Sequence, residues 1–153
     1  MNRSEQTCAF CDNLNIEGRA IFRDDVVIAF PTNTPIVPGH ILICPIRHVE
    51  KIDDLHESEM VQIVALLVRL KKVLQKTFDA EGFNVAWNEG GVAGQTVPHL
   101  HVHLVPRKKG DEGITEYEPR KFLYRPGSRA ESPVEEIRDV ARRLAVEFQN
   151  EIT

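Results

Sequence analysis

The chain has 153 residues and a formal net charge of −4, with 19 lysines and arginines against 23 aspartates and glutamates. This length suits one domain over residues 1–153, and the mildly acidic balance argues against binding to nucleic acid or to an anionic membrane. Three cysteines do not form a disulfide framework, and Cys44 in its apolar run is expected to be a buried apolar residue. We see no signal-peptide core or membrane span, so we expect a soluble, cytoplasmic protein.

Five short apolar segments are typical of strands. They are bounded by turn residues, such as the aspartate pair after residue 23 and the glycine-rich "EGGVAGQTV". The predicted strands cover residues 21–23, 26–30, 40–45, 83–88 and 99–106.

Two longer segments, 58–78 and 132–149, have the three- and four-residue spacing of helices. The second opens with Ser132 as the predicted N-cap and Pro133 at the first helical position. The first is apolar on more than one face, which predicts a second copy covering it and therefore a homodimer. Because helices separate few of the strands, we expect an α+β fold with an antiparallel sheet and its helices on one side.

The segment "PHLHVHLVPR" holds His99, His101 and His103 at two-residue spacing. Side chains two residues apart in a strand share one face and lie roughly 6.6 Å apart along the chain. One alternative to a functional row is an edge strand whose histidines are simply solvated. A metal site that uses all three is disfavoured, because three ligands in a line do not converge readily on one metal ion. The row suits nucleophilic catalysis, in which the middle imidazole, His101, attacks phosphorus and its neighbours orient it and move protons.

The glycine-rich loop "GGVAGQTV" comes directly before these histidines. Its backbone N–H groups, with the side chains of Gln95 and Thr96, are candidate donors to the negative charge that builds on a phosphate under attack. Glycine-rich hairpins are common, so the position of the loop is what favours this interpretation.

These residues resemble a known family. "HLHVHLV" resembles the His-φ-His-φ-His-φ-φ signature of the histidine triad (HIT) superfamily, where φ is apolar. "IVPGHILICPIRHVEKIDDL" and "NEGGVAGQTVPHLHVHLVPRKKGD" are similar to its fragile-histidine-triad branch, and the resemblance covers residues 22–111 of a predicted core over 20–111. It implies a HIT-like fold, a homodimer whose two five-stranded sheets join into one, purine nucleotide binding, and attack on the α-phosphate to give a nucleotidyl-histidine.

The resemblance also implies roles for single residues. His101 corresponds to the nucleophile, His99 and His103 to its flanking partners, and His40 in "PGH" to a fourth histidine that supports them. Thr32 departs from the asparagine or aspartate common at its position. The implied nucleotide-binding residues are Phe30, Thr32, Asn88, Gly94, Gln95, Thr96, His101 and His103.

Cys8 and Cys11 form a Cys-x-x-Cys pair in a predicted metal-binding segment over residues 5–15. Two thiolates at this spacing grip one side of a zinc ion, and two imidazoles complete a closed tetrahedral shell. Fragile-histidine-triad proteins lack this pair, but other histidine-triad proteins and the galactose-1-phosphate uridylyltransferases resemble the chain in having it. That resemblance implies structural zinc bound by Cys8, Cys11, His48 and His99; the alternative is a reduced pair without metal.

The leading hypothesis is a homodimeric zinc-containing hydrolase or transferase that cleaves dinucleoside polyphosphates, such as diadenosine tri- or tetraphosphate. Two rivals share its residues and its intermediate: a nucleoside phosphoramidase and a dinucleoside polyphosphate phosphorylase. A hypothesis of another class is a nucleotide-binding sensor or adaptor with incidental turnover.

Overall fold

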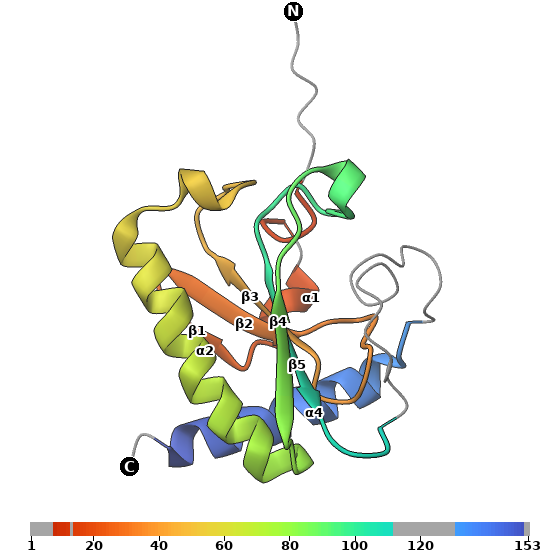
Figure 1. The fold of residues 1–153 in the computed structure, drawn as a ribbon. Coiled ribbons are helices and arrows are strands. Elements are labelled where there is room, and N and C mark those ends of the chain that lie inside the picture. Colours follow the sequence, from red (N-terminus) through yellow and green to blue (C-terminus); the bar gives the residue numbers. More distant parts are fainter. Residues whose placement is uncertain (1–7, 13, 112–130, 152–153) are drawn as a thin grey trace, which may run out of the picture.

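Five strands form one sheet in the computed structural model, which describes residues 8–12, 14–111 and 131–151. The strand order is β1-β2-β3-β5-β4, and every neighbouring pair is antiparallel, as expected (Figure 1). Residues 5–7 and 13 of the predicted metal-binding segment lie outside the described residues. The strands are β1 (Phe22–Arg23), β2 (Val27–Pro31), β3 (Ile41–Pro45), β4 (Gly82–Ala86) and β5 (Val102–Arg107).

Both long helices pack on the same face of this sheet, which confirms the predicted arrangement. The helices α2 (Glu57–Phe78) and α4 (Val134–Asn150) contact each other and strand β2 (Figure 1). Leu144 and Phe148 of α4 are fully buried there. The strand residues that join them in the main core are Val27, Ala29, Ile41, Ile43, Val102 and Leu104.

The opposite face of the sheet carries a smaller apolar cluster. Phe30 pairs with Leu42, and Leu42 pairs with His103, so these three side chains point away from the two long helices. Ile16 of the short helix α1 (Leu14–Glu17) packs on the same cluster. The alternation of side chains in the strands therefore puts the histidine row on the face that the long helices leave uncovered.

Strand β5 begins at Val102, so the prediction of a strand from residue 99 was wrong at that end. The neighbouring strand β3 ends at Pro45, which has no N–H for the ladder. The N–H of Leu100 donates instead to the carbonyl oxygen of Val49 over 2.6 Å. Leu100 still lies in the main core with Val102, so the histidines keep the opposite side although two of them precede the strand.

The ends of the helices also differ from the prediction. Pro133, not Ser132, is the N-cap of α4, and the N–H of Ser132 donates to the carbonyl oxygen of Asn33 over 3.0 Å. Helix α2 is preceded by His56, whose N–H donates to Oε2 of Glu59 over 2.7 Å. Among the described residues, neither of these helices nor any shorter one combines the length and apolarity needed to cross a bilayer.

Candidate active site and metal centre

His101 is held in one tautomer by the backbone. Its Nδ1–H donates to the carbonyl oxygen of His99 over 2.8 Å, which leaves the lone pair on Nε2. Burial lowers the pKa of His101 below its ordinary value of 6.5, against the opposing effect of this hydrogen bond. The ring is therefore neutral at neutral pH, and a neutral imidazole with a lone pair on Nε2 is able to attack phosphorus.

A second set of hydrogen bonds orients His103. The N–H of Ile36 donates to Nδ1 of His40 over 3.1 Å, and Nε2–H of His40 then donates to Nδ1 of His103 over 2.9 Å. His103 must therefore carry its own proton on Nε2. The rings of His101 and His103 lie 5.0 Å apart between centroids. Neighbouring rings thus carry a lone pair and an N–H donor on their Nε2 atoms, on the face of the sheet that the two long helices leave uncovered.

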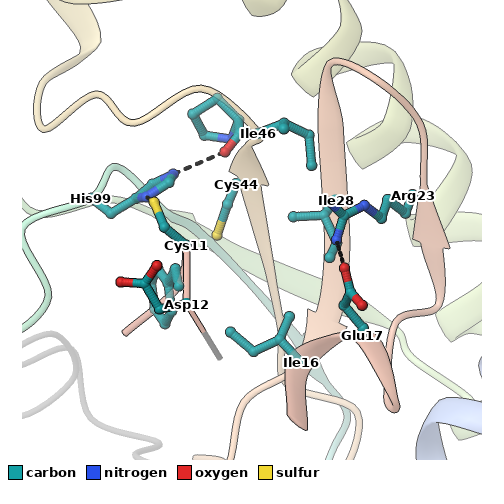
Figure 2. Close-up of a pocket in the computed structure, with 11 residues that line it drawn as sticks. Cys11, Asp12, Ile16, Glu17, Arg23, Ile28, Cys44, Ile46 and His99 are labelled. Carbon is teal, nitrogen blue, oxygen red and sulfur yellow. Dashed lines mark hydrogen bonds and ion pairs between the residues drawn. The ribbon is translucent and has the colours of Figure 1, made fainter. Parts of the chain in front are cut away.

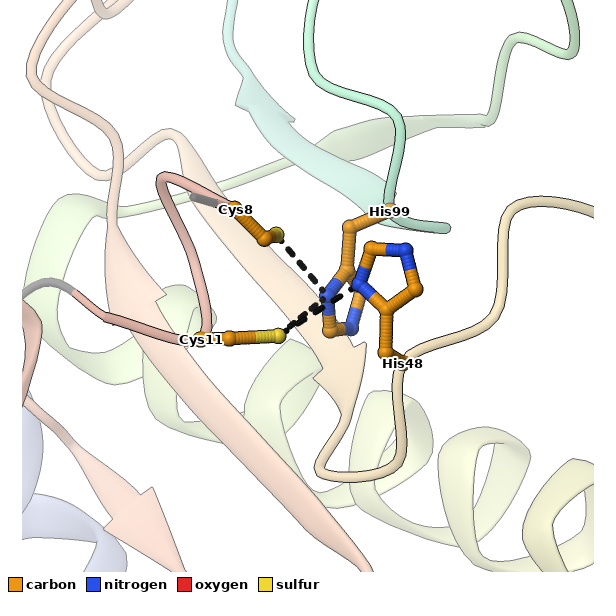
Figure 3. Close-up of side chains that lie close together, drawn as sticks. All are labelled: Cys8, Cys11, His48 and His99. Carbon is orange, nitrogen blue, oxygen red and sulfur yellow. Dashed lines mark hydrogen bonds between the residues drawn. The ribbon is translucent and has the colours of Figure 1, made fainter. Parts of the chain in front are cut away.

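Cys8, Cys11, His48 and His99 converge from separate segments of the chain (Figure 3). One ligand atom from each lies within 4.8 Å of all the others. The Sγ atom of Cys11 is 3.4 Å from Nδ1 of His48 and 3.5 Å from Nδ1 of His99, and Sγ of Cys8 is 3.5 Å from the same His99 atom. Tetrahedral zinc, with bonds of about 2.3 Å to sulfur and about 2.0 Å to nitrogen, separates such ligands by about 3.5 Å. The three sulfur-to-nitrogen separations fit this geometry.

The protonation of the group also suits a cation. Burial and the neighbouring Cys8 thiol raise the pKa of Cys11 to about 11, so the Cys11 thiol stays protonated unless a positive charge compensates. Burial lowers the pKa of His99, and its Nε2–H donates to the carbonyl oxygen of Pro45 over 2.8 Å. The neutral ring therefore turns its Nδ1 lone pair toward both sulfur atoms, as a metal ligand does.

Cys44 stands outside this ligand group. It is 1% exposed, and burial raises the pKa of its thiol well above 9.0. Its side chain lines a cavity of about 250 Å³ together with Ile28 and His99 (Figure 2). The prediction of a buried, apolar Cys44 is confirmed.

Hydrogen bonds from side chains to the backbone stabilise the glycine-rich loop. Oε1 of Gln95 accepts from the N–H of Gly90 over 2.7 Å. Nε2 of Gln95 donates to a backbone carbonyl oxygen in the connection between β3 and α2 over 2.9 Å. Asn88 is buried, and its Nδ2 donates to the carbonyl oxygen of Gly94 over 3.4 Å. Gly94 has φ of 91°, a conformation that favours glycine. The contribution of Gln95 and of the exposed Thr96 to phosphate binding stays a prediction.

The residues predicted for the base and ribose lie near the histidines. Phe30 shares a row of the sheet with Leu42 and His103, two strands away, which is about 10 Å. The N–H of Thr32 donates to the carbonyl oxygen of His40 over 3.2 Å, so Thr32 lies beside the supporting histidine. Their part in nucleotide binding stays a prediction.

Two residues of this region were missed from the sequence. Phe10 lies between the two cysteines, and its ring centroid is 5.2 Å from that of His101 and 5.6 Å from that of Phe30. The sequence feature that could have indicated this role is an aromatic residue inside the Cys-x-x-Cys turn. Glu89 precedes the glycines, and its Oε1 accepts from the N–H of Ile52 over 2.9 Å. Nothing in the sequence pattern indicated this contact.

The family model described as the HIT domain matches residues 13–110. The chain belongs to the HIT family. In this HIT protein, the match includes the segment with the three alternating histidines, as well as His40 and His48, whereas the Cys-x-x-Cys pair precedes it.

Three relatives of this HIT protein are named as enzymes that act on dinucleoside polyphosphates. The asymmetrical bis(5'-nucleosyl)-tetraphosphatase of Schizosaccharomyces pombe is 38% identical over 63% of this chain and 53% of that protein. The bis(5'-adenosyl)-triphosphatase of Dictyostelium discoideum is 35% identical over 62% of this chain and 64% of that protein. The AP-4-A phosphorylase of Mycobacterium tuberculosis is 36% identical over 62% of this chain and 49% of that protein. The chain thus spans about half to two-thirds of the length of these relatives.

Solved HIT structures share the fold. A hypothetical histidine triad nucleotide-binding protein from Sulfolobus tokodaii is 25% identical, with 94% of this chain and 93% of that chain covered and a TM-score of 0.75. A Zn-bound histidine triad family protein from Mycobacterium smegmatis is 24% identical, with 95% of this chain and 96% of that chain covered and a TM-score of 0.72. The second similarity concerns the fold alone.

Proposed function

We propose that this HIT protein is an enzyme that cleaves dinucleoside polyphosphates, such as diadenosine tri- or tetraphosphate, at the α-phosphate through a nucleotidyl-histidine intermediate. The observation that carries the proposal is the pairing of tautomers, with a lone pair on Nε2 of His101 beside an N–H on Nε2 of His103. The activities named for the relatives from Schizosaccharomyces pombe, Dictyostelium discoideum and Mycobacterium tuberculosis support the substrate class.

In the first step, Nε2 of His101 forms a bond to the α-phosphorus, and the bond from that phosphorus to the bridging oxygen breaks. The electron pair of the broken bond leaves with the rest of the substrate. The imidazole becomes positively charged, and the carbonyl oxygen of His99 stabilises that charge through Nδ1–H. His103 donates from Nε2 to the phosphate oxygens on which negative charge builds.

In the second step, water attacks the same phosphorus and the bond from phosphorus to nitrogen breaks. Its electron pair returns to Nε2 of His101, a water proton passes to solvent, and the mononucleotide leaves. We assign nucleotide binding to the face of the sheet that the two long helices leave uncovered, around the triad. The proposed binding residues, besides His101 and His103, are Phe30 for the base, Thr32 for the ribose, and Asn88, Gly94, Gln95 and Thr96 for the phosphates.

The test compares wild type with His101→Ala on diadenosine tetraphosphate, with mass spectrometry of the products and of the intact protein. We expect mononucleotide release by wild type alone, with a transient mass increase of one adenylyl group. His56→Ala is the matched control, because His56 is an exposed histidine at the start of α2 and should leave turnover unchanged. Turnover by His101→Ala contradicts the assigned nucleophile, and an intact substrate with wild type contradicts the polyphosphate assignment.

The rival enzymes differ only in the groups that leave or accept. Adenosine phosphoramidate in place of diadenosine tetraphosphate detects a phosphoramidase. Added inorganic phosphate detects a phosphorylase, the activity named for the Mycobacterium tuberculosis relative, because phosphate then replaces water as acceptor. A sensor or adaptor predicts that His101→Asn keeps both ligand affinity and biological activity while losing turnover. Loss of the biological activity with binding intact supports the enzyme.

We also propose a structural zinc ion at Cys8, Cys11, His48 and His99. The support is the chemistry of the donors and their separations of 3.4 to 3.5 Å. A closed shell of two thiolates and two imidazoles leaves no position for water, so the ion would cross-link the N-terminal turn to the segment that carries the triad. Thiolate ligands persist where thiols stay reduced, which fits the cytoplasm.

A second copy of this chain is the partner that we propose for the exposed apolar surface of α2 and β4. Strand β4 is an edge of the sheet, so its outer backbone groups are available for pairing with the same strand of another copy. Such pairing joins the two sheets, and apolar side chains of the helices cover one another. The exposed apolar residues on or next to these elements are Met60, Val61, Val64, Val68, Val85 and Trp87.

A further inference from the structure

Phe10 contacts three rings of the site at once. Its centroid lies 5.2 Å from that of His101, 5.8 Å from that of His99 and 5.6 Å from that of Phe30. The ring is nearly perpendicular to His101, at 87°, which is the edge-to-face arrangement that aromatic pairs favour. Phe10 thus lies between a metal ligand, the proposed nucleophile and the proposed base site.

Two kinds of contact position the turn that carries Phe10, the apolar packing of Phe10 and the hydrogen bonds of the two sulfur atoms. Its backbone hydrogen bonds are internal, because the N–H groups of Cys11 and Asp12 both donate to the carbonyl oxygen of Cys8. In the described part of the chain, the side-chain hydrogen bonds from the turn to other segments run from the sulfur atoms to His48, which follows β3, and to His99, which precedes β5.

The cavity of about 250 Å³ borders the same turn. Cys11 and Asp12 line it on one side, and Ile28 and Cys44 of the sheet line it on another (Figure 2). Packing therefore leaves room for the turn to shift. A metal ion that joins both sulfur atoms to His48 and His99 would remove that freedom.

We propose that Phe10 is a positioning residue that couples metal binding to His101. The metal fixes the Cys8 to Cys11 turn, the turn fixes Phe10, and Phe10 restricts the His101 ring to the orientation in which Nδ1–H donates to the carbonyl oxygen of His99. Nε2 then faces the phosphorus in a constant direction. This role rests on the proposed zinc site and, for its effect on rate, on the proposed nucleophile, whereas the restriction of the ring exists without substrate.

The first measurement is made without substrate, on metal-loaded wild type, Phe10→Ala and Phe10→Leu, each checked for full metal content. Nitrogen-15 NMR of the histidine rings reports the tautomer of His101. We expect one tautomer with the proton on Nδ1 in wild type, a mixture in Phe10→Ala, and recovery in Phe10→Leu, which restores bulk. Ala9→Ser changes an exposed residue of the same turn and should resemble wild type. An unchanged His101 signal in Phe10→Ala overturns the proposal.

The second measurement is a cycle of metal removal and Phe10→Ala, read as the rate of nucleotidyl-histidine formation. Each change alone should slow the reaction about tenfold, and the two together should slow it no further, because both act through one contact. Multiplied effects overturn the coupling. If wild type forms no nucleotidyl-histidine, the proposed function fails while the NMR comparison still decides the role of Phe10. That comparison needs no metal-free protein, so it also stands if metal removal unfolds the chain.

Discussion

His40 sets the proton position on His103 through a hydrogen bond of 2.9 Å between Nε2 of the first ring and Nδ1 of the second. The first ring is 1% exposed and is oriented in turn by the N–H of Ile36, whereas the second is half-buried at the site. The backbone of a loop thus determines, through the buried His40, which nitrogen of the half-buried His103 is a donor. In the proposed mechanism, His40 therefore acts through His103, without contact with the substrate.

This relationship predicts that His40→Leu slows formation of the nucleotidyl-histidine by about 10- to 100-fold. Leucine fills the space but accepts nothing from Ile36 and donates nothing to His103, so His103 is free to take either tautomer. His40→Gln should recover most of the rate, because one amide supplies an acceptor and a donor. Single-turnover rates measured by mass spectrometry decide the matter. Equal rates for His40→Leu and wild type would show that the hydrogen bond has no catalytic part.

The fold and the triad were accessible from the sequence because both depend on local alternation. Leu100 and Val102 enter the core, and the histidines that alternate with them take the other side. The exact end of the strand was not accessible. It depends on Pro45 in a neighbouring strand, which removes a hydrogen-bond donor from the ladder at that point.

The metal group was named from family resemblance, and its geometry comes from the fold. His48 and Cys11 are 37 positions apart in the sequence, yet their ligand atoms lie 3.4 Å apart. No periodic pattern reports such a contact. The position of Phe10 was inaccessible for the same reason, since its packing on His101 depends on how the N-terminal turn meets the sheet. Sequence pattern therefore predicted the chemistry of the site better than the contacts that orient it.

Two cysteine variants separate metal binding from packing. Cys8→Ser should lose the metal, because a hydroxyl is a poor zinc ligand, whereas Cys44→Ala should keep about one metal per subunit. With free metal at about 1,000 times its dissociation constant, binding stabilises the folded chain by about 4 kcal/mol. Most of that should vanish in Cys8→Ser, against about 1 kcal/mol in Cys44→Ala from its small cavity. Elemental analysis and thermal unfolding measure both. Metal retained in Cys8→Ser removes that thiol from the ligand group.

Charge on the exposed face of α2 should disrupt the proposed dimer. Val64 on α2 is 59% exposed and Val146 on α4 is 63% exposed. The same substitution at the two positions therefore differs in location and hardly in exposure, and only Val64 lies in the proposed interface. We expect Val64→Glu to run as a monomer, because an unpaired carboxylate in an apolar interface is costly, and Val146→Glu to remain a dimer. Light scattering during size-exclusion chromatography gives the masses. A dimeric Val64→Glu would move the interface away from α2.

The charge on Glu59 should make the free energy of unfolding depend on pH in the acid range. This carboxylate is 6% exposed and accepts hydrogen bonds from Arg47 and from the N–H of His56. The Arg47 hydrogen bond, opposed by burial and aided by the backbone, holds the pKa of Glu59 below its ordinary value of 4.5. A carboxyl whose pKa is lowered by folding stabilises the folded state fully above its ordinary pKa, and that contribution is lost as the pH falls below it.

The free energy of unfolding of Glu59→Gln should therefore lie below that of wild type by about 1 kcal/mol at neutral pH. The gap should narrow as the pH falls from about 5 to about 3, because wild type then loses the same charge. Urea unfolding at each pH measures the gap. Glu57→Gln, at an exposed position of the same helical turn, is the control and should stay within about 0.5 kcal/mol of wild type throughout. A gap for Glu59→Gln that is constant with pH would assign the loss to packing rather than to the charge that links the start of α2 to Arg47.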